Sequence, residues 1–455
     1  MQLSSNVIPD SIKFVILVTL LLDWVPIIWN TAKTWIRPEN LMLDHPALTD
    51  TEMTRLLSPG GHEDFEIEGY RNSSTLQRWG KATYGMSWRI SIHVFAWRRE
   101  KSLRRLCESL LRAQYSGHEV PLYFHVDGEP LNLVVNYVKD FKWPHGPKIV
   151  NIRQQKLGMP TAILSGWTPK DDEEHAILLE DDTEVAVGFF EYSLYCLSMT
   201  TYKRLVEGEN HGMMGCSLYT PRVDEIGPAP NAWSPPTWNP TYAIGPRHRL
   251  LYFQLPCSWG AIYHAKYWKE FLRYYAIRTQ ISNFPLTPNS RSNEWFSSWK
   301  RILIELMLFR GWYLMYPSFL GQTSFSTNYF ERGIHSVAEG QKAPVPNEIR
   351  KHGDRRFTVP LYQDFSFRAS LPTPSAGSIR QIPYVSLYHK RVMSRRELVV
   401  NVQPFLDAVK DPALYHFFGQ EVSVPDLSLG ADLEMDHVSP IPDGGDFVPE
   451  VPEEQ

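Results

Sequence analysis

Cysteine is scarce in this sequence, and basic residues never gather into a long run. The 455 residues include four cysteines and no CxxC pair, so neither a zinc ribbon nor a thioredoxin-type site is indicated. The thiols are either free and buried, as isolated cysteines usually are, or paired, which would require an oxidising compartment. The 46 Lys and Arg residues balance 50 Asp and Glu, which leaves no electrostatic footprint for nucleic acid. The four cysteines are Cys107, Cys196, Cys216 and Cys257.

Internal repeats are also absent, and the hydrophobic fraction of 43% is typical of a globular protein. At roughly 150 residues per domain, the length is enough for about two or three domains, or for one large α/β domain with additions.

One long apolar run lies near the N-terminus. The segment FVILVTLLLDWVPIIWNTA between Lys13 and Lys33 is just long enough to cross a hydrocarbon core of about 30 Å. Asp23 and Pro26 disfavour full insertion into the membrane, so a segment that lies at the membrane interface or is cleaved off is an alternative. No small-residue cleavage site follows, which favours a membrane anchor within residues 1–37. Basic residues on both flanks leave its orientation open.

The segments around the central region differ from it in composition. Residues 38–80 are polar and without periodicity, as expected of a stem, and they include a glycosylation sequon at Asn72. Residues 341–420 are predicted to form an extension packed on the central domain. Residues 421–455 contain acidic residues and prolines but no Lys or Arg, which predicts a disordered tail.

The central region reads as alternating strands and helices. Residues 88–96 are rich in β-branched and aromatic side chains, and Leu103, Leu106 and Leu110 then recur with helical spacing. This alternation predicts an α/β fold with a mostly parallel sheet and flanking helices, in which ligands bind at the carboxyl ends of the strands. The further elements are predicted as strands at 121–126, 148–152 and 176–179 and helices at 131–141, 161–167 and 263–275.

Three consecutive carboxylates, Glu180, Asp181 and Asp182, follow the apolar run AILL. At the mouth of a buried strand, their mutual repulsion would raise their pKa values unless a cation compensates. Mg²⁺ or Mn²⁺ would do so, because these ions take one or two carboxylates and complete their coordination with phosphate and water. A solvated acidic turn at the start of the next helix is the plain structural alternative.

The order ISIHVFAWRREKSLRRLCESLL, FHVDG and ILLEDDTEVAVGFFEY resembles the nucleotide-sugar-dependent glycosyltransferases of the GT-A fold. The EDD and FFEY combination is similar to the N-acetylglucosaminyltransferase I type, and the chain also resembles family 2-like transferases of fungi and plants. The resemblance implies a Rossmann-like GT-A domain over residues 81–340.

The resemblance also implies roles for residues of the first half. Asp182 would ligate the metal, Asp181 would meet the ribose or a metal-bound water, and Glu180 would contact the donor sugar. Asp127 of HVDG would hold the uracil or ribose. Two further positions are expected beside the nucleotide: Arg98, although Arg99 is adjacent, and Gly158, although a glycine in a loop is also ordinary turn chemistry.

In the second half, Trp259 and Gly260 resemble the turn beneath the transferred sugar. Glu294, in SNEWFSSWKR, stands where the family has an aspartate general base; the alternative is a Glu at the start of a helix that serves as an N-terminal cap partner. His335 resembles a late histidine that ligates the metal or contacts the diphosphate, although a lone histidine is more often structural. Most of the tryptophans here are expected in the core, and one or two are expected to stack on a sugar.

Together these features predict a Mn²⁺- or Mg²⁺-dependent transferase that moves a sugar from a nucleoside-diphosphate sugar to a hydroxyl of a glycan, glycolipid or glycoprotein. Inversion, with Glu294 as base, is expected from the resemblance, and nothing in the residues excludes retention. A single anchor would place the enzyme in the Golgi or ER membrane, facing the lumen. A nucleotidyltransferase is disfavoured because AWRREKS, after the first strand, lacks the glycines of a phosphate loop. A non-catalytic sugar-binding or scaffold protein of the same fold remains the alternative.

Overall fold

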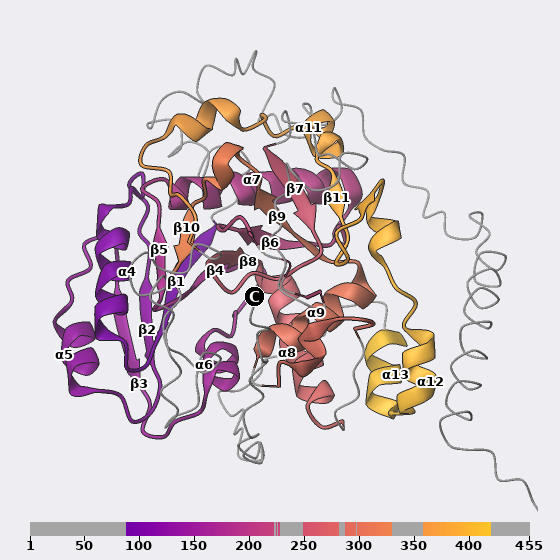
Figure 1. The fold of residues 1–455 in the computed structure, drawn as a ribbon, viewed down its shortest axis with the longest axis horizontal. Helices are drawn as coiled ribbons and strands as arrows, with labels where there is room; N and C mark the ends of the chain where they lie inside the picture. The colour runs from indigo at the N-terminus through magenta and orange to yellow at the C-terminus, as the bar shows by residue number, and fades with distance from the viewer. Residues whose placement is uncertain are drawn as a thin grey trace, which may run out of the picture. The chain divides into compact units, whose positions relative to one another are not determined.

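A ten-stranded sheet crosses the described part of the chain, in the order β12-β11-β7-β9-β6-β8-β4-β1-β2-β3 (Figure 1). The computed structural model describes residues 88–222, 224, 226–227, 249–281, 287–296, 298–329 and 358–419. All of them belong to one unit, residues 49–455. The predicted anchor, the stem with its sequon, His335 and the acidic tail lie outside the described residues.

The first half of the sheet follows the pattern expected from the sequence. Strand β1, Arg89–Ala96, is built from β-branched and aromatic residues and is buried along nearly its whole length. Helix α4, Glu100–Arg112, then turns Leu103, Leu106 and Leu110 towards the core. The other elements of this half are β2 Leu122–Val126, α5 Asn132–Asp140, β3 Lys148–Ile152, α6 Met159–Gly166, β4 Glu174–Glu180, β5 Thr183–Val185 and α7 Phe189–Glu207.

Parallel pairing brings the carboxyl ends of these strands to one edge. β1 pairs in parallel with both β2 and β4, and β2 pairs in parallel with β3. The register places Ala96 beside Val126 and Phe95 beside Glu180. The predicted parallel arrangement is therefore confirmed for this half, and the loops after β1, β2 and β4 lie next to one another.

The second half of the sheet is mixed. β8, Ala261–Tyr263, runs antiparallel to both of its neighbours, β4 and β6, so the expectation of a mostly parallel sheet holds less well here. A separate two-stranded sheet pairs β10 with β5. The other elements are β6 Met213–Ser217, β7 Leu250–Phe253, α8 Ala265–Arg278, η4 Arg291–Glu294, α9 Trp299–Arg310, β9 Tyr313–Pro317, η5 Leu320–Gln322 and β10 Ser326–Asn328.

Residues 358–419 add strands to the sheet as well as helices around it. β11 pairs in parallel with β7, and β12 pairs with β11. The ribbon shows α13 beside α8, with α12 next to α13 (Figure 1). The elements of this segment are η6 Ser366–Ser370, α11 Ala376–Gln381, β11 Tyr384–Val385, β12 Arg391–Val392, η7 Arg395–Leu398, α12 Gln403–Val409 and α13 Pro412–Gly419.

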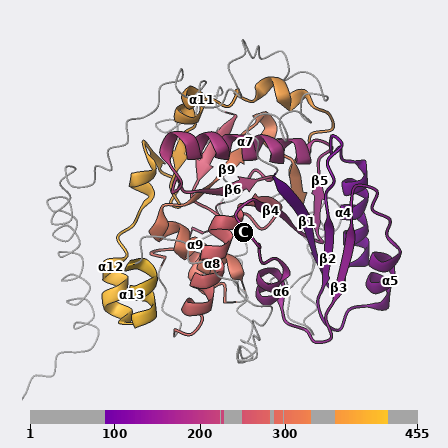
Figure 2. The same ribbon diagram turned by 180° about the vertical axis from the view of Figure 1, so that it is seen from behind.

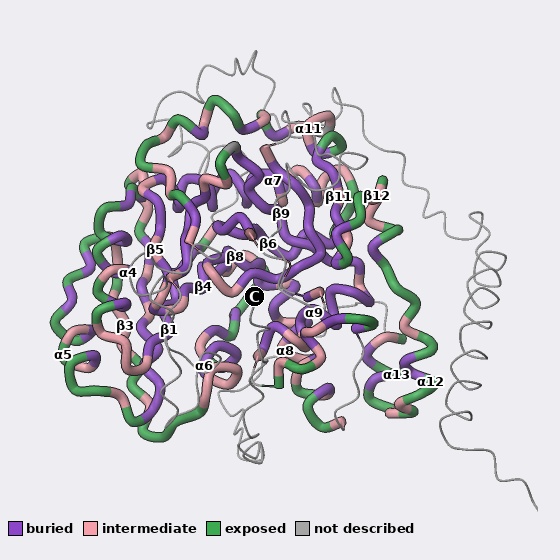
Figure 3. Tube along the Cα trace, in the orientation of Figure 1, coloured by how far each residue is buried: buried purple, intermediate pink, exposed green. Residues whose placement is uncertain are grey.

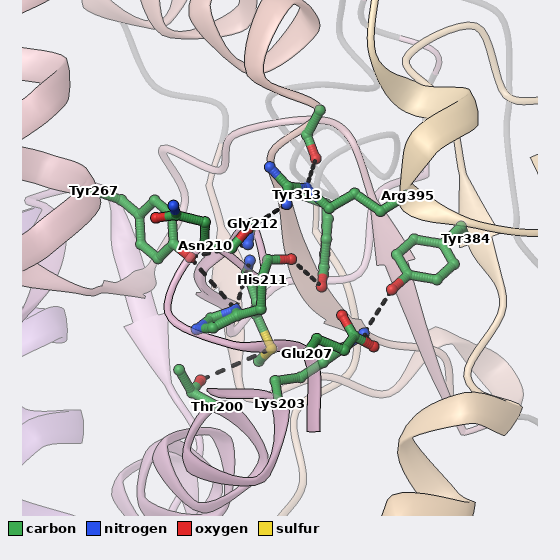
Figure 4. A network of polar contacts seen from close by, with 12 residues as sticks. Thr200, Lys203, Glu207, Asn210, His211, Gly212, Tyr267, Tyr313, Tyr384 and Arg395 are labelled. Carbon is green, nitrogen blue, oxygen red and sulfur yellow. Dashed lines mark hydrogen bonds and ion pairs between the residues drawn. The ribbon is translucent and has the colours of Figure 1, made fainter. Parts of the chain in front are cut away.

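A polar network ties this C-terminal segment to α7 and to the C-terminal end of α9 (Figure 4). The Lys203 ammonium donates to Glu207 at 2.6 Å and to the Tyr384 hydroxyl at 2.5 Å. Burial lowers the pKa of Lys203 to about 8. Arg395 donates to the backbone carbonyls of Gly311 at 3.1 Å and Arg310 at 2.8 Å. The buried Lys203 ammonium is thus satisfied by two partners, one of them in the C-terminal segment.

Helices cover the sheet on both faces (Figure 2). α4, α5 and α7 pack in one hydrophobic cluster, and α6, α8 and α9 pack in a second. The inner strands of the sheet are buried, whereas the edge strands β3 and β12 and the outer helical turns are partly or fully exposed (Figure 3). All four cysteines are buried and free, which agrees with the plainer of the two expectations for them. Among the described helices, none combines the length and apolar character needed to cross a membrane.

Candidate active site at the carboxyl edge of the sheet

Backbone hydrogen bonds hold the ends of β1, β2 and β4 together. The Asp127 amide donates to the Ala96 carbonyl at 3.0 Å, and the Asp181 amide donates to the Phe95 carbonyl at 3.1 Å. The loop after each strand therefore starts from a fixed point. The polar residues predicted at these three strand ends do meet at one edge.

The acidic triplet sits where the apolar strand β4 ends. Asp181 is buried, whereas Glu180 and Asp182 are partly exposed. Burial, with the neighbouring Asp182 carboxylate, raises the pKa of Glu180 to about 8. Burial also raises the pKa of Asp181 to about 7, and Arg99 opposes part of that rise. The repulsion expected among these carboxylates is thus present and only partly compensated.

The compensating cation is Arg99, which sequence reasoning did not select. Its guanidinium donates to Asp181 and, through Nη1, to Asp182 Oδ2 at 2.7 Å. Burial lowers the pKa of Arg99, but Asp181 and Asp182 outweigh that effect and raise it. Arg99 precedes the first residue of α4. This turn from strand into helix carries its side chain towards the acidic triplet.

Arg98, the predicted nucleotide contact, is directed elsewhere. Its Nε donates to the Glu129 carbonyl at 3.1 Å, and its guanidinium lies 4.4 Å from the centre of the Trp97 ring. The Lys156 ammonium lies 4.3 Å from the same ring. Arg98 and Lys156 thus form a cationic rim around Trp97, away from the carboxylates.

Asp182 is also held by β10, a segment far away in sequence. Asn328 Nδ2 donates to Asp182 Oδ1 at 3.0 Å, and the Tyr329 amide donates to the Asp182 carbonyl at 2.9 Å. The pairing of Asn328 with Thr183 sets this geometry. Asn328 was not among the predicted site residues, because no local pattern marks a residue that reaches the site from another strand.

Asp127 organises the neighbouring loop. Its two carboxylate oxygens accept from the backbone amides of Leu157 at 2.9 Å and Gly158 at 3.0 Å. The loop also approaches Gly128 so closely that a Cβ there would lie 1.9 Å from the Gln155 carbonyl carbon. Gly158 has φ +78°, with open space around its missing side chain. The loop predicted beside the nucleotide is therefore fixed in place by the residue predicted to bind that nucleotide.

Trp259 and Gly260 lie against β10. The Ser326 hydroxyl donates to the Trp259 carbonyl at 2.6 Å. Gly260 has φ +99°, and a Cβ on it would lie 2.8 Å from the Ser326 hydroxyl oxygen. A glycine is therefore required here by conformation and by space. Trp259 stays half-buried, with its ring edge-on to Tyr219 at 4.8 Å.

A second cation, Lys300, lies between two tryptophans. Its ammonium is 5.5 Å from the centre of the Trp259 ring and 5.6 Å from that of Trp295. Lys300 is 4% exposed. Its charge reaches the acidic triplet, because Lys300 opposes the rise in the pKa of Glu180. This lysine was also missed by sequence reasoning, although it lies inside the segment singled out for the general base.

Glu294 is exposed at the end of η4, directly before Trp295. The following helix, α9, starts after Ser298 without a side-chain hydrogen bond at its N-cap. Glu294 lies in the first turn of η4, a position that fits the helix-start alternative. Its role as a base stays a prediction.

The donor set at this edge suits a divalent cation that shares its coordination with a ligand. Within the described ranges, no group of three or more His, Cys, Asp or Glu side chains converges as a closed metal site. Mg²⁺ and Mn²⁺ need only one or two carboxylates when phosphate and water complete the shell. Asp182 meets that need, since its side chain is 13% exposed. Two of the three carboxylates are in direct contact with one guanidinium, that of Arg99, while the Lys300 ammonium opposes the rise in the pKa of Glu180. His335, the other predicted ligand, lies outside the described residues.

Comparison with known proteins gives a partial match in sequence. A family model described as the SPBC1E8.03c C-terminal domain matches residues 101–210, which include the loop at Gly158 and the acidic triplet. No curated protein matches this sequence.

Among solved structures, the chain is similar to residues 1–349 of S. aureus TarS in complex with UDP-GlcNAc. The identity is 9%, the TM-score is 0.33, and the match covers 54% of this chain and 60% of that one. It is also similar to the mannosyltransferase PcManGT from Pyrobaculum calidifontis in complex with GDP-Man and Mn²⁺. There the identity is 9%, the TM-score is 0.26, and the coverage is 43% and 51%. The chain thus spans 60% of that TarS structure.

Proposed function

We propose that this protein is a glycosyltransferase that transfers a sugar from a nucleoside-diphosphate sugar, most simply a UDP-sugar, to a hydroxyl acceptor. The observation that carries the proposal is the acidic triplet at the end of β4. The pKa values of Glu180 and Asp181 are raised, and Asp182 is held in place from two directions by Arg99 and Asn328. Buried carboxylates with perturbed pKa values at a strand end are typical of functional sites.

Mn²⁺ or Mg²⁺ bound through Asp182 would supply Lewis-acid stabilisation of the leaving diphosphate. The chain's own residues divide the remaining tasks. Asp127 fixes the loop that ends at Gly158, on the nucleotide side. Glu180 and Trp259 would line the sugar, and Gly260 lets the backbone pass close to β10.

On the acceptor side, Glu294 would take the proton of the attacking hydroxyl. Its exposed position at the end of η4 leaves it accessible to an acceptor that enters from solvent. Direct attack by the hydroxyl inverts the anomeric carbon, and we propose inversion for that reason. The acceptor would be a glycan, glycolipid or glycoprotein.

We further propose that the segment between Lys13 and Lys33 anchors the protein in the Golgi or ER membrane, with the catalytic domain in the lumen. The sequon at Asn72 supplies the test. Expressed in secretory cells, the protein should carry an N-glycan that is absent from an Asn72→Gln variant. A cytosolic domain would give no difference between the two.

Nucleotide-sugar binding by the full-length protein tests the enzymatic proposal. We expect one UDP-sugar to bind in the presence of Mn²⁺ and to be hydrolysed slowly, with both properties lost in Asp182→Asn. Glu108→Gln, which alters an exposed carboxylate on α4, is the matched control and should behave as wild type. Binding without any hydrolysis or transfer would point to the sugar-binding protein instead. No binding of any nucleotide sugar to the folded protein would refute the proposal.

A further inference from the structure

Arg99 makes two charge-assisted contacts that a resident divalent cation would also need. Its guanidinium bridges Asp181 and Asp182, and its bond to Asp182 Oδ2 is 2.7 Å long. Asn328 already donates to the other oxygen, Asp182 Oδ1. Arg99 and a cation at Asp182 would therefore draw on the same carboxylate.

When no metal ion is bound, Arg99 offsets the repulsion among the carboxylates of the acidic triplet. Asp181 and Asp182 have side chains only 4% and 13% exposed, and Glu180 is adjacent. Partly buried like charges repel strongly unless a counter-charge lies close by. A guanidinium is well suited to this position, because its planar fork donates to two carboxylates at once.

The position of Arg99 leaves its side chain able to move while its backbone stays fixed. The Arg99 carbonyl accepts from the Leu103 amide at 3.0 Å, in the first turn of α4, so the residue is tied to the helix. Its side chain is 22% exposed and has several rotatable bonds. A guanidinium displaced from Asp182 would therefore remain at the mouth of the site with its donors unsatisfied. Phosphate oxygens are the natural acceptors for such a fork.

We propose that Arg99 is a displaceable counter-ion. It neutralises Asp181 and Asp182 before the cation arrives, releases Asp182 to a divalent cation, and then binds the diphosphate of the nucleotide donor. The inference rests on the proposed function for its last step alone. Arg99 is then a nucleotide-binding residue with two opposed effects: it weakens the binding of the metal by itself, and it strengthens the binding of the nucleotide.

The test separates these effects in the full-length protein. Binding of Mn²⁺ without nucleotide is measured by the electron paramagnetic resonance signal of the free ion, in wild type, Arg99→Gln, Arg99→Lys and Arg104→Gln. Arg104 is the matched control, because it lies on the same helix, pairs with Glu100 and is half-exposed. UDP binding is then measured calorimetrically in saturating Mn²⁺.

We expect Arg99→Gln to bind Mn²⁺ about ten-fold more tightly than wild type, and UDP about ten-fold more weakly, each a change of about 1.4 kcal/mol. Both affinities of Arg99→Lys should lie between those of wild type and Arg99→Gln, because an ammonium is a single point charge. Arg104→Gln should match wild type in both assays. If Arg99→Gln is unfolded without metal, Mn²⁺ should restore its circular dichroism spectrum, and Arg99→Lys then supplies the affinities.

If Arg99→Gln binds Mn²⁺ no more tightly than wild type, the proposed role of Arg99 as a counter-ion is wrong. Where only Arg99→Lys folds, the same result for that variant refutes the role. Unchanged UDP affinity overturns the diphosphate contact. If Mn²⁺ binds more tightly to the variant while neither protein binds UDP or any UDP-sugar, the counter-ion stands and the proposed function fails. If wild type binds a UDP-sugar with Mn²⁺ and the variant gains no Mn²⁺ affinity, the proposed function stands and the counter-ion fails.

Discussion

The acidic edge of the site (Arg99, Glu180, Asp181 and Asp182) and its aromatic side (Trp259, Trp295 and Lys300) are built by different forces. Charge-assisted hydrogen bonds fix the acidic edge, and they come from the start of α4 and from β10. The aromatic side is held by ring contacts around a buried ammonium. Directional bonds hold a charge at one point, whereas packed rings tolerate small shifts. We therefore propose that the acidic edge binds the ion and the nucleotide donor, and that the aromatic side accommodates the sugar or the acceptor.

The largest expected effect is at the acidic edge. Asp182→Asn keeps the bond from Asn328 within reach but removes the charge that a cation needs. We expect nucleotide-sugar turnover to fall at least about 100-fold, in line with the loss of one strong electrostatic contact. Steady-state kinetics at saturating Mn²⁺ measure this. A loss of less than about three-fold would mean that Asp182 is not the metal ligand.

Gly260 tests whether the aromatic side depends on backbone geometry. Gly260→Ala should destabilise the fold by about 2 kcal/mol, because φ +99° and the close Ser326 hydroxyl both oppose a Cβ. Gly158→Ala, with φ +78° but open space, should cost about 1 kcal/mol. Urea unfolding of both variants gives the comparison. Equal losses would show that crowding at Gly260 is relieved by movement of Ser326.

Lys300 tests whether the aromatic side contributes charge as well as packing. Lys300→Met keeps the length of the side chain but removes the ammonium between the two tryptophans. We expect kcat/KM to fall about ten-fold, a loss of about 1.4 kcal/mol of transition-state binding, while Lys300→Arg retains most of the activity. Equal losses in the two variants would indicate that the shape of the lysine, and not its charge, matters.

The smallest expected effect is on the pH dependence of stability, and it comes from a buried histidine pair on β1 and β2. His93 Nδ1 and His125 Nε2 are 2.9 Å apart, and burial lowers the pKa of both, that of His125 to about 4. Both are neutral in the native state and take up protons on unfolding. Their stabilising contribution is therefore complete above about pH 6.5 and is lost as the pH falls towards 4.

His125→Gln should make the fall in melting temperature between pH 6.5 and 4 shallower than in wild type, because it removes one of these titrating groups. Thermal unfolding at a series of pH values measures it. Parallel curves for the two proteins would show that the pair does not govern acid stability.

Local patterns predicted the elements at the acidic edge closely. The strand expected at 88–96 is observed at Arg89–Ala96, and that expected at 148–152 at Lys148–Ile152. The helix expected at 263–275 begins two residues later, because Ala261–Tyr263 forms β8 instead. Short buried strands of this kind are hard to separate from a helix start by periodicity alone.

The sequence by itself determined the alternation of strands and helices, the acidic triplet at a strand end and the segments that border the site, because each depends on neighbours in the chain. Only the tertiary structure decided that Arg99 and not Arg98 meets the carboxylates, that Asn328 holds Asp182, and that Lys300 lies between two tryptophans. Those contacts depend on the turn into α4, on the pairing of β10 with β5 and on the packing of α9. Spacing along the chain does not encode them, since each joins residues brought together only when the sheet and its helices assemble.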